Sequence, residues 1–291
     1  GGCGKNLEPS QLIEPRCKIS GDVPVLRPTT HWYLRLSDFA DWLRGWLDDK
    51  PEWRQLVLNE ARKYLDEGLH TRAITRDLSW GIPMPGDDPE YEGKVIYVWF
   101  DAPIGYISST VEYFRNIGQP DRWKEFWKPE DPDSVKLYNF IGKDNIFFHA
   151  VMFPIMCHGM QQGYKLTDNV VSNAFLTLEG RQFSKSEGWY IDPLDFLDRY
   201  PADSARFYLC SIMPESSDSE FRWDDFAARH NELANVYGNI VHRVISFAQA
   251  NFGGIPAYSG DIAANEADSA LFADIARSLD STAQSISEFS F

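Results

Sequence analysis

The feature that most constrains the fold is an alternation of apolar runs with helical patterns between residues 94 and 178. A continuous apolar run, which is typical of a strand covered on both faces, lies at 95–100, and two further predicted strands lie at 137–141 and 170–178. Helical patterns separate them at 103–118, where Pro103 suits a first helical position, and at 145–160. Strands that alternate with helices predict a parallel sheet with helices on both sides. The sequence therefore predicts half of a nucleotide-binding α/β fold.

The segments on either side of this region follow other patterns. Ahead of it, we expect a strand at 31–36, a helix capped by Ser37 and Asp38, and a second helix from Pro51 to Gly68. Behind it, the sequence predicts short helices at 193–200 and 202–212, a polar break at 214–220, and longer helices at 223–252 and from Glu266. The carboxyl-terminal part is thus expected to be all-α, and we expect the chain to be a fragment of a longer protein.

Composition limits the class of protein. With 291 residues, 43% of them hydrophobic, the chain is long enough for more than one packed domain. A net charge of −15 gives no support for RNA binding by the molecule as a whole, although a local basic surface is compatible with it. No apolar run is long enough to span a bilayer, and the four cysteines are scattered. We expect a cytoplasmic protein with no membrane attachment.

Two cysteines, Cys3 and Cys17, each resemble half of a zinc knuckle. A structural zinc site takes four Cys or His ligands, and neither cysteine has the second member of a Cys-x-x-Cys pair. Two ordinary reduced cysteines are therefore the favoured interpretation. No metal site is predicted beyond these two remnants.

The loop at 180–188 carries a lysine between two hydroxyls, since Lys185 stands between Ser184 and Ser186. A lysine ammonium is a compact charge suited to phosphate oxygens, and hydroxyls and glycine N–H groups can complete an anion cradle. The alternative is an ordinary solvated loop.

Two further clusters follow predicted strands, at the carboxyl ends where parallel sheets bind their ligands. In the first, Trp99 and Tyr106 flank Ala102 and Pro103, which suits the wall of an apolar pocket. The alternative is core packing around a helix that begins at the proline.

The second cluster runs from Lys143 and Asp144 to His149. An aspartate at a helix start can accept hydrogen bonds from ribose hydroxyls. The alternatives are a structural N-cap and a satisfied core histidine.

Taken in order, these segments resemble the methionyl branch of the class I aminoacyl-tRNA synthetases. Residues 97–106 read Tyr-Val-Trp-Phe-Asp-Ala-Pro-Ile-Gly-Tyr, and 140–144 read Phe-Ile-Gly-Lys-Asp. Residues 184–186 match the end of the Lys-Met-Ser-Lys-Ser signature, with Gln182 and Phe183 in place of its first Lys and Met. Supporting matches are Thr-Arg-Asp at 75–77 and Ala-Asp-Ser-Ala-Arg at 202–206, and the resemblance runs from about residue 7 to 252. The family's His-Ile-Gly-His signature does not occur in the sequence; it belongs to a half that should precede residue 1.

The resemblance implies a role for each matching position. The side-chain pocket for methionine would be lined by Trp99, Ala102, Pro103, Tyr106 and His149, because aromatic walls and one polar nitrogen suit a thioether. ATP or the adenylate would be bound by Lys143, Asp144 and Lys185, with Lys185, Ser184 and Ser186 as the catalytic group. Asn239 and Arg243 would read the tRNA anticodon, with an exposed helix face as the alternative.

The resemblance also implies an organisation in four parts. These are the remainder of a connective insertion with a partial knuckle (1–72), the second half of a Rossmann-like catalytic domain (73–178), the signature loop with stem-contact helices (179–222), and the truncated start of an α-helical anticodon-binding domain (223–291). The implied activity is ATP-dependent activation of methionine and its transfer to tRNA(Met), with Mg²⁺ accompanying ATP and Zn²⁺ possible only in a full-length protein. The fragment alone is expected to be inactive. One alternative is a non-catalytic tRNA- or protein-binding module. Another is a different class I synthetase, but Trp99 and His149 argue against that one because they suit a thioether pocket.

Overall fold

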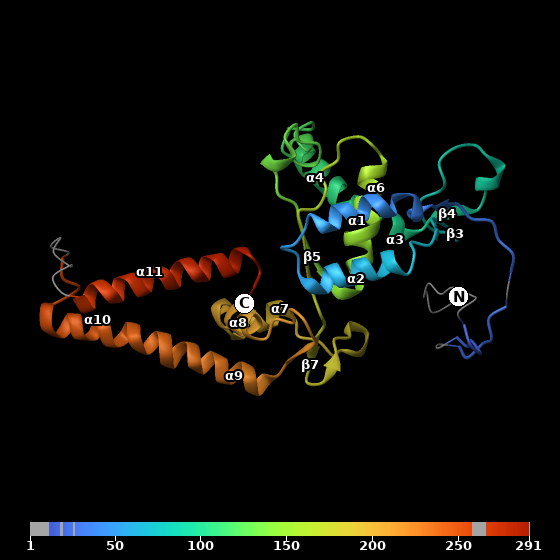
Figure 1. The fold of residues 1–291 in the computed structure, drawn as a ribbon. Helices are drawn as coiled ribbons and strands as arrows, with labels where there is room; N and C mark the ends of the chain where they lie inside the picture. The colour runs from blue at the N-terminus through green and yellow to red at the C-terminus, as the bar shows by residue number, and fades with distance from the viewer. Residues whose placement is uncertain (1–11, 18–19, 26, 258–265, 291) are drawn as a thin grey trace. The chain divides into compact units, whose positions relative to one another are not determined.

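The protein is described by a computed structural model that covers residues 12–17, 20–25, 27–257 and 266–290 (Figure 1). Its internal contacts divide the chain into two units. The first unit combines 1–38 with 70–105, and the second combines 39–69 with 106–291. Cys3 lies outside the described residues. The four-part organisation expected from the resemblance stays a prediction.

Two short antiparallel strand pairs organise the first unit. Strand β1 (Tyr33–Leu34) pairs with β2 (Arg72–Ala73), and β3 (Thr75–Asp77) pairs with β4 (Lys94–Ile96). The Thr75 side chain is fully buried, and its hydroxyl accepts a hydrogen bond from the backbone N–H of Trp32 at 3.2 Å. Two short helical turns complete the unit: η3 (Pro89–Tyr91) and α3 (Val98–Asp101).

The predicted strand at 95–100 is wrong beyond Ile96. Thr75, the first residue of β3, is the partner of Ile96, and beyond this antiparallel pair the N–H of Tyr97 still bonds to the carbonyl of Ile74 at 2.8 Å. The backbone then turns, because the N–H of Phe100 bonds to the carbonyl of Tyr97 and that of Ala102 to the carbonyl of Val98, both at 2.8 Å. The apolar run that indicated a buried strand is instead a short helix with Val98 and Trp99 about half exposed.

The centre of the second unit is a parallel pair of strands, β5 (Tyr138–Gly142) and β6 (Asn169–Asn173). The middle of β6, Val170 to Ser172, is buried. The helical segments ahead of and between these strands are α4 (Ile104–Asn116), α5 (Lys124–Trp127), η4 (Pro132–Ser134), η5 (Lys143–Asn145), the π-helical turn η6 (Phe147–Met152) and α6 (Phe153–Gly159). The predicted strand at 137–141, the first part of the strand predicted at 170–178 and both predicted helices are confirmed.

Two early helices, α1 (Ala40–Asp48) and α2 (Gln55–Asp66), also belong to the second unit. Helix α1 follows the 3-10 turn η2 (Leu36–Phe39), and its N-cap position is Phe39 with no side-chain cap, so the predicted caps Ser37 and Asp38 are wrong. Apolar residues at helical spacing explain the buried face, because Leu43 and Leu47 of α1 are fully buried.

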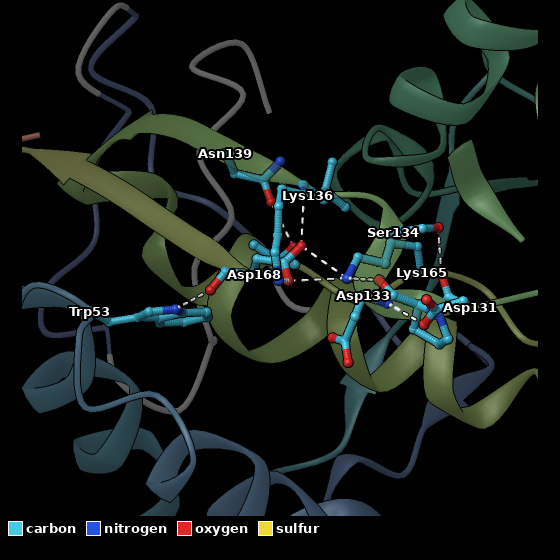
Figure 2. Close-up of polar contacts among 11 residues, drawn as sticks. Trp53, Asp131, Asp133, Ser134, Lys136, Asn139, Lys165 and Asp168 are labelled. Atoms are coloured by element: carbon cyan, nitrogen blue, oxygen red, sulfur yellow. Dashed lines mark hydrogen bonds and ion pairs between the residues drawn. The ribbon is translucent and has the colours of Figure 1, made fainter. Parts of the chain in front are cut away.

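The amino ends of β5 and β6 are closed by a cluster of polar contacts around Asp168 (Figure 2). The Asp168 carboxylate accepts hydrogen bonds from the backbone N–H of Leu137 at 2.7 Å and from the Lys165 ammonium at 3.0 Å. The Trp53 indole donates to the Asp168 carbonyl at 2.5 Å, and this contact ties the segment before α2 to β6. The amino ends are thus filled, and the ligands of parallel α/β sheets bind beyond the opposite, carboxyl ends of the strands.

A separate three-stranded sheet follows. Strand β7 (Leu176–Leu178) pairs antiparallel with β8 (Arg181–Gln182) and parallel with β9 (Ser219–Phe221). The single strand predicted at 170–178 is therefore wrong: it breaks at Ala174, whose N–H bonds to the carbonyl of Pro214 at 2.7 Å. The polar break predicted at 214–220 likewise runs into a strand, β9. Five buried side chains form the core beneath this sheet: Leu178, Phe196, Tyr208, Phe221 and Phe226.

The remainder of the described chain is helical, as predicted. It comprises α7 (Pro193–Arg199), α8 (Ala202–Ser211), α9 (Trp223–Glu232), the π-helical turn η8 (Leu233–Gly238), α10 (Asn239–Phe252) and α11 (Glu266–Ser287) (Figure 1). Gly253 ends α10 in the left-handed conformation with φ 71°, where glycine is favoured. Across the described residues, every helix is too short or too polar to cross a membrane.

Candidate functional site

The turn after β5 is the first element of the site. Gly142 ends the strand, and Lys143, Asp144 and Asn145 form the 3-10 turn η5. A Cβ atom at residue 142 would lie 2.6 Å from Oδ1 of Asp144, so the close approach of this carboxylate requires glycine. Gly142 occupies the N-cap position with no side-chain cap, so the structural N-cap given above as the alternative role of Asp144 is wrong. Asp144 is exposed at the carboxyl end of the parallel pair.

Lys143 is held by a carboxylate from the segment just before β9. Its ammonium donates to Oδ1 of Asp218 at 2.6 Å, and the same oxygen accepts the backbone N–H of Phe175 at 2.9 Å. The Lys143 nitrogen also lies 4.7 Å from the centre of the Phe175 ring, a cation–π contact. The hydrogen bonds from Lys143 and Phe175 lower the pKa of the Asp218 carboxyl, so it carries its charge at neutral pH.

His149 and Tyr106 meet through their polar atoms. Nδ1 of His149 lies 3.0 Å from the carbonyl oxygen of Asn145, so it must carry the proton and donate. Nε2 is then the acceptor in the neutral ring, and the Tyr106 hydroxyl donates to it at 2.8 Å. Burial lowers the pKa of His149 and raises that of Tyr106. Both groups are therefore neutral at physiological pH.

The signature loop, residues 180–188 with Lys185, is built on a tight hairpin between β7 and β8. Glu179 and Gly180 both have positive φ, 47° and 74°, as a two-residue hairpin turn requires. Beyond β8, Ser184 and Trp189 exchange backbone hydrogen bonds of 2.8 and 2.9 Å, which close the loop at its base. Lys185 begins the 3-10 turn η7 (Lys185–Glu187) inside that closed loop, and its side chain is exposed.

Three contacts of side chains fix the base of this loop. The Trp189 indole donates to the carbonyl of Leu178 at 3.0 Å, and the Arg181 guanidinium lies 4.6 Å from the centre of the Trp189 ring. Arg181 also pairs with Glu187 at 3.2 Å. The base is thus held to β7, while the Ser184 and Ser186 hydroxyls lie 3.2 Å from each other beside Lys185.

The remaining predicted site residues lie on two other elements. Trp99 lies in α3, with Ala102 and Pro103 directly after it, in the first unit. Asn239 and Arg243 are both exposed on α10 in the second unit, four residues apart and therefore on one helical face. The structure thus brings Tyr106 to His149 and sets Lys143 next to Asp144 in one turn.

The described residues contain no group of three or more His, Cys, Asp or Glu side chains that fits a metal ion. Cys17 is half-buried in a turn, where its backbone N–H bonds to the carbonyl of Asp22 at 2.8 Å. Asp218 is a partner of Lys143 that sequence reasoning missed. It stands in a Ser-Ser-Asp-Ser run with no periodicity, so nothing in the sequence separates it from its polar neighbours.

Comparison with known proteins identifies the family. The profile of the family described as tRNA synthetases class I (M) matches residues 1–245. The chain is 42% identical over 298 residues to the methionine–tRNA ligase of Pyrococcus furiosus and 47% identical over 288 residues to that of Protochlamydia amoebophila. Each alignment covers 99% of this chain, but the chain spans only about two fifths of these relatives, 41% and 40%.

The fold is similar to that of a solved synthetase. The structure titled Mycobacterium tuberculosis methionyl-tRNA synthetase in complex with methionyl-adenylate matches with a TM-score of 0.70 and 26% identity, over 92% of this chain and 50% of that one. This likeness and the parallel strands of the second unit confirm the expected fold class, part of a Rossmann-like α/β domain. With the family profile covering most of the sequence, the chain belongs to the class I tRNA synthetases of the methionyl (M) family.

Proposed function

We propose that the protein containing this chain is a methionine–tRNA ligase, which activates methionine with ATP and transfers it to tRNA(Met). The observation that carries the proposal is Lys185, an exposed ammonium between two hydroxyls in a loop that paired backbone closes at its base. Family membership supports it independently, because both relatives compared above are named methionine–tRNA ligase.

In the proposed reaction, the carboxylate oxygen of methionine attacks the α-phosphorus of ATP. The bond from that phosphorus to the bridging oxygen breaks, and pyrophosphate leaves as methionyl-adenylate forms. Charge increases on the phosphate oxygens during this step, and Lys185 would stabilise it together with the Ser184 and Ser186 hydroxyls. Lys143 and Asp144 would bind the nucleotide at the carboxyl end of β5. The protein supplies orientation and electrostatics rather than a covalent intermediate.

The amino acid and the tRNA would contact other elements. Tyr106 and His149 would face the methionine side chain, with Trp99, Ala102 and Pro103 assigned to the same pocket by the resemblance alone. Asn239 and Arg243 would contact anticodon bases, because an amide and a guanidinium on one exposed helical face can hydrogen-bond unstacked bases. A cytoplasmic location is part of the same proposal.

Two metals belong to the proposal only as expectations. Mg²⁺ would accompany the phosphates of ATP, and Zn²⁺ would need ligands beyond Cys17. Since the described residues offer no metal-binding cluster, no residue of this chain is proposed as a metal ligand and no step depends on one.

The test is methionine-dependent exchange between ATP and pyrophosphate by the complete gene product. Lys185→Ala should lower the exchange rate roughly a hundredfold or more, as the loss of one transition-state contact does. Lys63→Ala is the matched control, since Lys63 is an exposed lysine on α2 that pairs only with Glu60 at 3.9 Å in the described structure. A change below about twofold for Lys185→Ala would remove this residue from the mechanism. Absence of exchange in the unsubstituted protein would favour the non-catalytic tRNA- or protein-binding module.

A further inference from the structure

The contact between Lys143 and Asp218 joins two segments that are distant in the sequence. Residue 143 follows the carboxyl end of β5, and residue 218 precedes β9, 75 positions later. One oxygen, Oδ1 of Asp218, accepts from both the Lys143 ammonium and the backbone N–H of Phe175. Phe175 directly precedes β7, the strand that leads into the signature loop. The carboxylate therefore connects the turn after β5 to the start of β7.

The backbone that carries Asp218 is itself well anchored. The N–H of Ser219 bonds to the carbonyl of Phe175 at 3.0 Å, and the Ser219 hydroxyl donates to the carbonyl of Ile212 at 2.6 Å. The N–H of Ala174 bonds to the carbonyl of Pro214 at 2.7 Å. These bonds fix both sides of the loop, so the Asp218 carboxylate is a fixed acceptor for a long and otherwise flexible lysine side chain.

Stability alone is a poor explanation for this pair. The side chains of Lys143 and Asp218 are 34% and 50% exposed, and exposed ion pairs contribute little to the free energy of unfolding. An ammonium has three N–H donors, and Asp218 takes one. The others remain for an anionic ligand at the carboxyl end of β5. Fixing the ammonium in advance lowers the entropy lost when such a ligand binds.

We infer that Asp218 is a positioning residue for ATP: it orients Lys143 at the turn after β5 and ties this turn to the strand that leads into the Lys185 loop. The inference rests on the proposed function. Asp218 acts through Lys143 and is not expected to touch the nucleotide. Its removal should therefore weaken the use of ATP more than the use of methionine.

The test is Asp218→Asn in the complete gene product, with methionine-dependent pyrophosphate exchange as the assay. Asparagine keeps an oxygen for the Phe175 N–H but removes the charge that faces Lys143, and a half-exposed position tolerates this change. We expect the KM for ATP to rise about fivefold to tenfold, while the KM for methionine stays within about twofold. The matched control is Asp121→Asn, because Asp121 is an exposed carboxylate that pairs with Lys124 at 2.8 Å. It should change neither KM.

A double-substitution cycle separates positioning from a structural role. In a Lys143→Met background, Asp218→Asn should change the KM for ATP by less than about twofold, because the group it orients is gone. An unreduced effect in that background would overturn the inference, and so would an Asp218→Asn protein that matches Asp121→Asn. A fall in the KM for ATP would overturn it as well, since Asp218 would then hold Lys143 away from the nucleotide. Absence of exchange in the unsubstituted protein would instead overturn the proposed function, and this inference with it.

Discussion

At the scale of single residues, the hydrogen bond between Tyr106 and His149 determines which polar atom of the two side chains can still bind a ligand. Asn145 fixes the proton on Nδ1 of His149, and Tyr106 occupies Nε2. Both ring nitrogens of His149 therefore already have hydrogen-bond partners. This differs from the expectation that a nitrogen of His149 itself faces the thioether of methionine. The Tyr106 oxygen keeps its lone pairs, and its hydrogen-bonded orientation is set by a buried, neutral histidine.

This geometry predicts that Tyr106→Phe weakens methionine binding through the lost hydroxyl. Removing one hydrogen-bonding group costs about 1 kcal/mol, so the dissociation constant measured by calorimetry should rise roughly fivefold. Tyr113→Phe is the matched control, because Tyr113 lies on the same helix α4 and is 59% exposed. Equal affinities for the two variants would show that the Tyr106 hydroxyl serves only to satisfy the histidine.

At the scale of elements, the two ends of the β5–β6 pair serve different purposes. The amino end is filled by Asp168, Lys165 and Trp53 (Figure 2), whereas the carboxyl end carries Gly142 and the exposed Asp144. The Lys165 side chain is only 7% exposed and that of Asp168 16%. Breaking a pair in such surroundings leaves an uncompensated charge away from water.

Asp168→Asn is accordingly expected to destabilise the protein. The loss should be roughly 3 kcal/mol, at the lower end of what breaking a buried ion pair costs, and it appears as a lower midpoint of urea unfolding. The control is Asp66→Asn, which breaks the ion pair between Asp66 and Arg44. The side chain of Asp66 is 68% exposed and that of Arg44 is 50% exposed, so the loss of stability should be less than about 1 kcal/mol. Similar midpoints for both variants would contradict a structural role for the Asp168 cluster.

The carboxyl end predicts a different response to substitution. Gly142→Ala places a methyl group where the Asp144 carboxylate lies, so the carboxylate must move. We expect a higher KM for ATP in pyrophosphate exchange with an almost unchanged thermal midpoint. Gly45→Ala is the control: nothing lies within 4 Å of its Cβ position in the middle of α1, so alanine should stabilise the protein by about 0.5–1 kcal/mol. An unchanged KM for Gly142→Ala would separate Asp144 from the nucleotide.

Elements also show how far the sequence determines the fold. Helices α7, α8 and α10 follow from apolar periodicity and end signals, which are local, and the prediction is confirmed. The bounds of a strand depend on its partner strands, which cannot be identified from the local sequence. The run at 95–100 becomes the helix α3 from Val98, because β3 begins at Thr75, opposite Ile96. The run at 170–178 splits because the backbone at Ala174 and Phe175 bonds to residues 214 and 218.

The candidate site likewise contains residues that local motifs predict and a partner that only the tertiary fold brings in. Two of the residues that motif spacing singled out, Lys185 and Asp144, are exposed, one in a loop and the other in the turn after β5. Their roles stay predictions. The group that holds Lys143 is absent from that set, because Asp218 becomes its neighbour only through the parallel pairing of β7 with β9.

At the scale of the whole molecule, five titratable groups in the two units make the protein less stable in acid. Burial lowers the pKa of His31 in the first unit and of His149 in the second. Hydrogen bonds from lysines lower the pKa of three carboxyls, Asp77, Asp121 and Asp218. In each case the unfolded chain binds protons more readily than the folded protein. Acid therefore favours unfolding through all five groups.

The sign of this linkage gives a prediction in two pH windows. The histidine contribution is complete above the ordinary pKa of 6.5 and is lost as the pH falls below that value towards the lowered pKa of the folded protein. The carboxyl contribution is complete above 3.8 and is lost only below it. The thermal midpoint should thus be level between about pH 7 and 8, decline from about 6.5 downwards and decline again below about 4. His149→Gln removes one titrating group, so the first decline should be shallower than in the unsubstituted protein, while the second stays the same. Identical first declines would mean that His149 becomes protonated in the folded protein as readily as in the unfolded chain, and the bond from Tyr106 to its Nε2 would then not persist in solution.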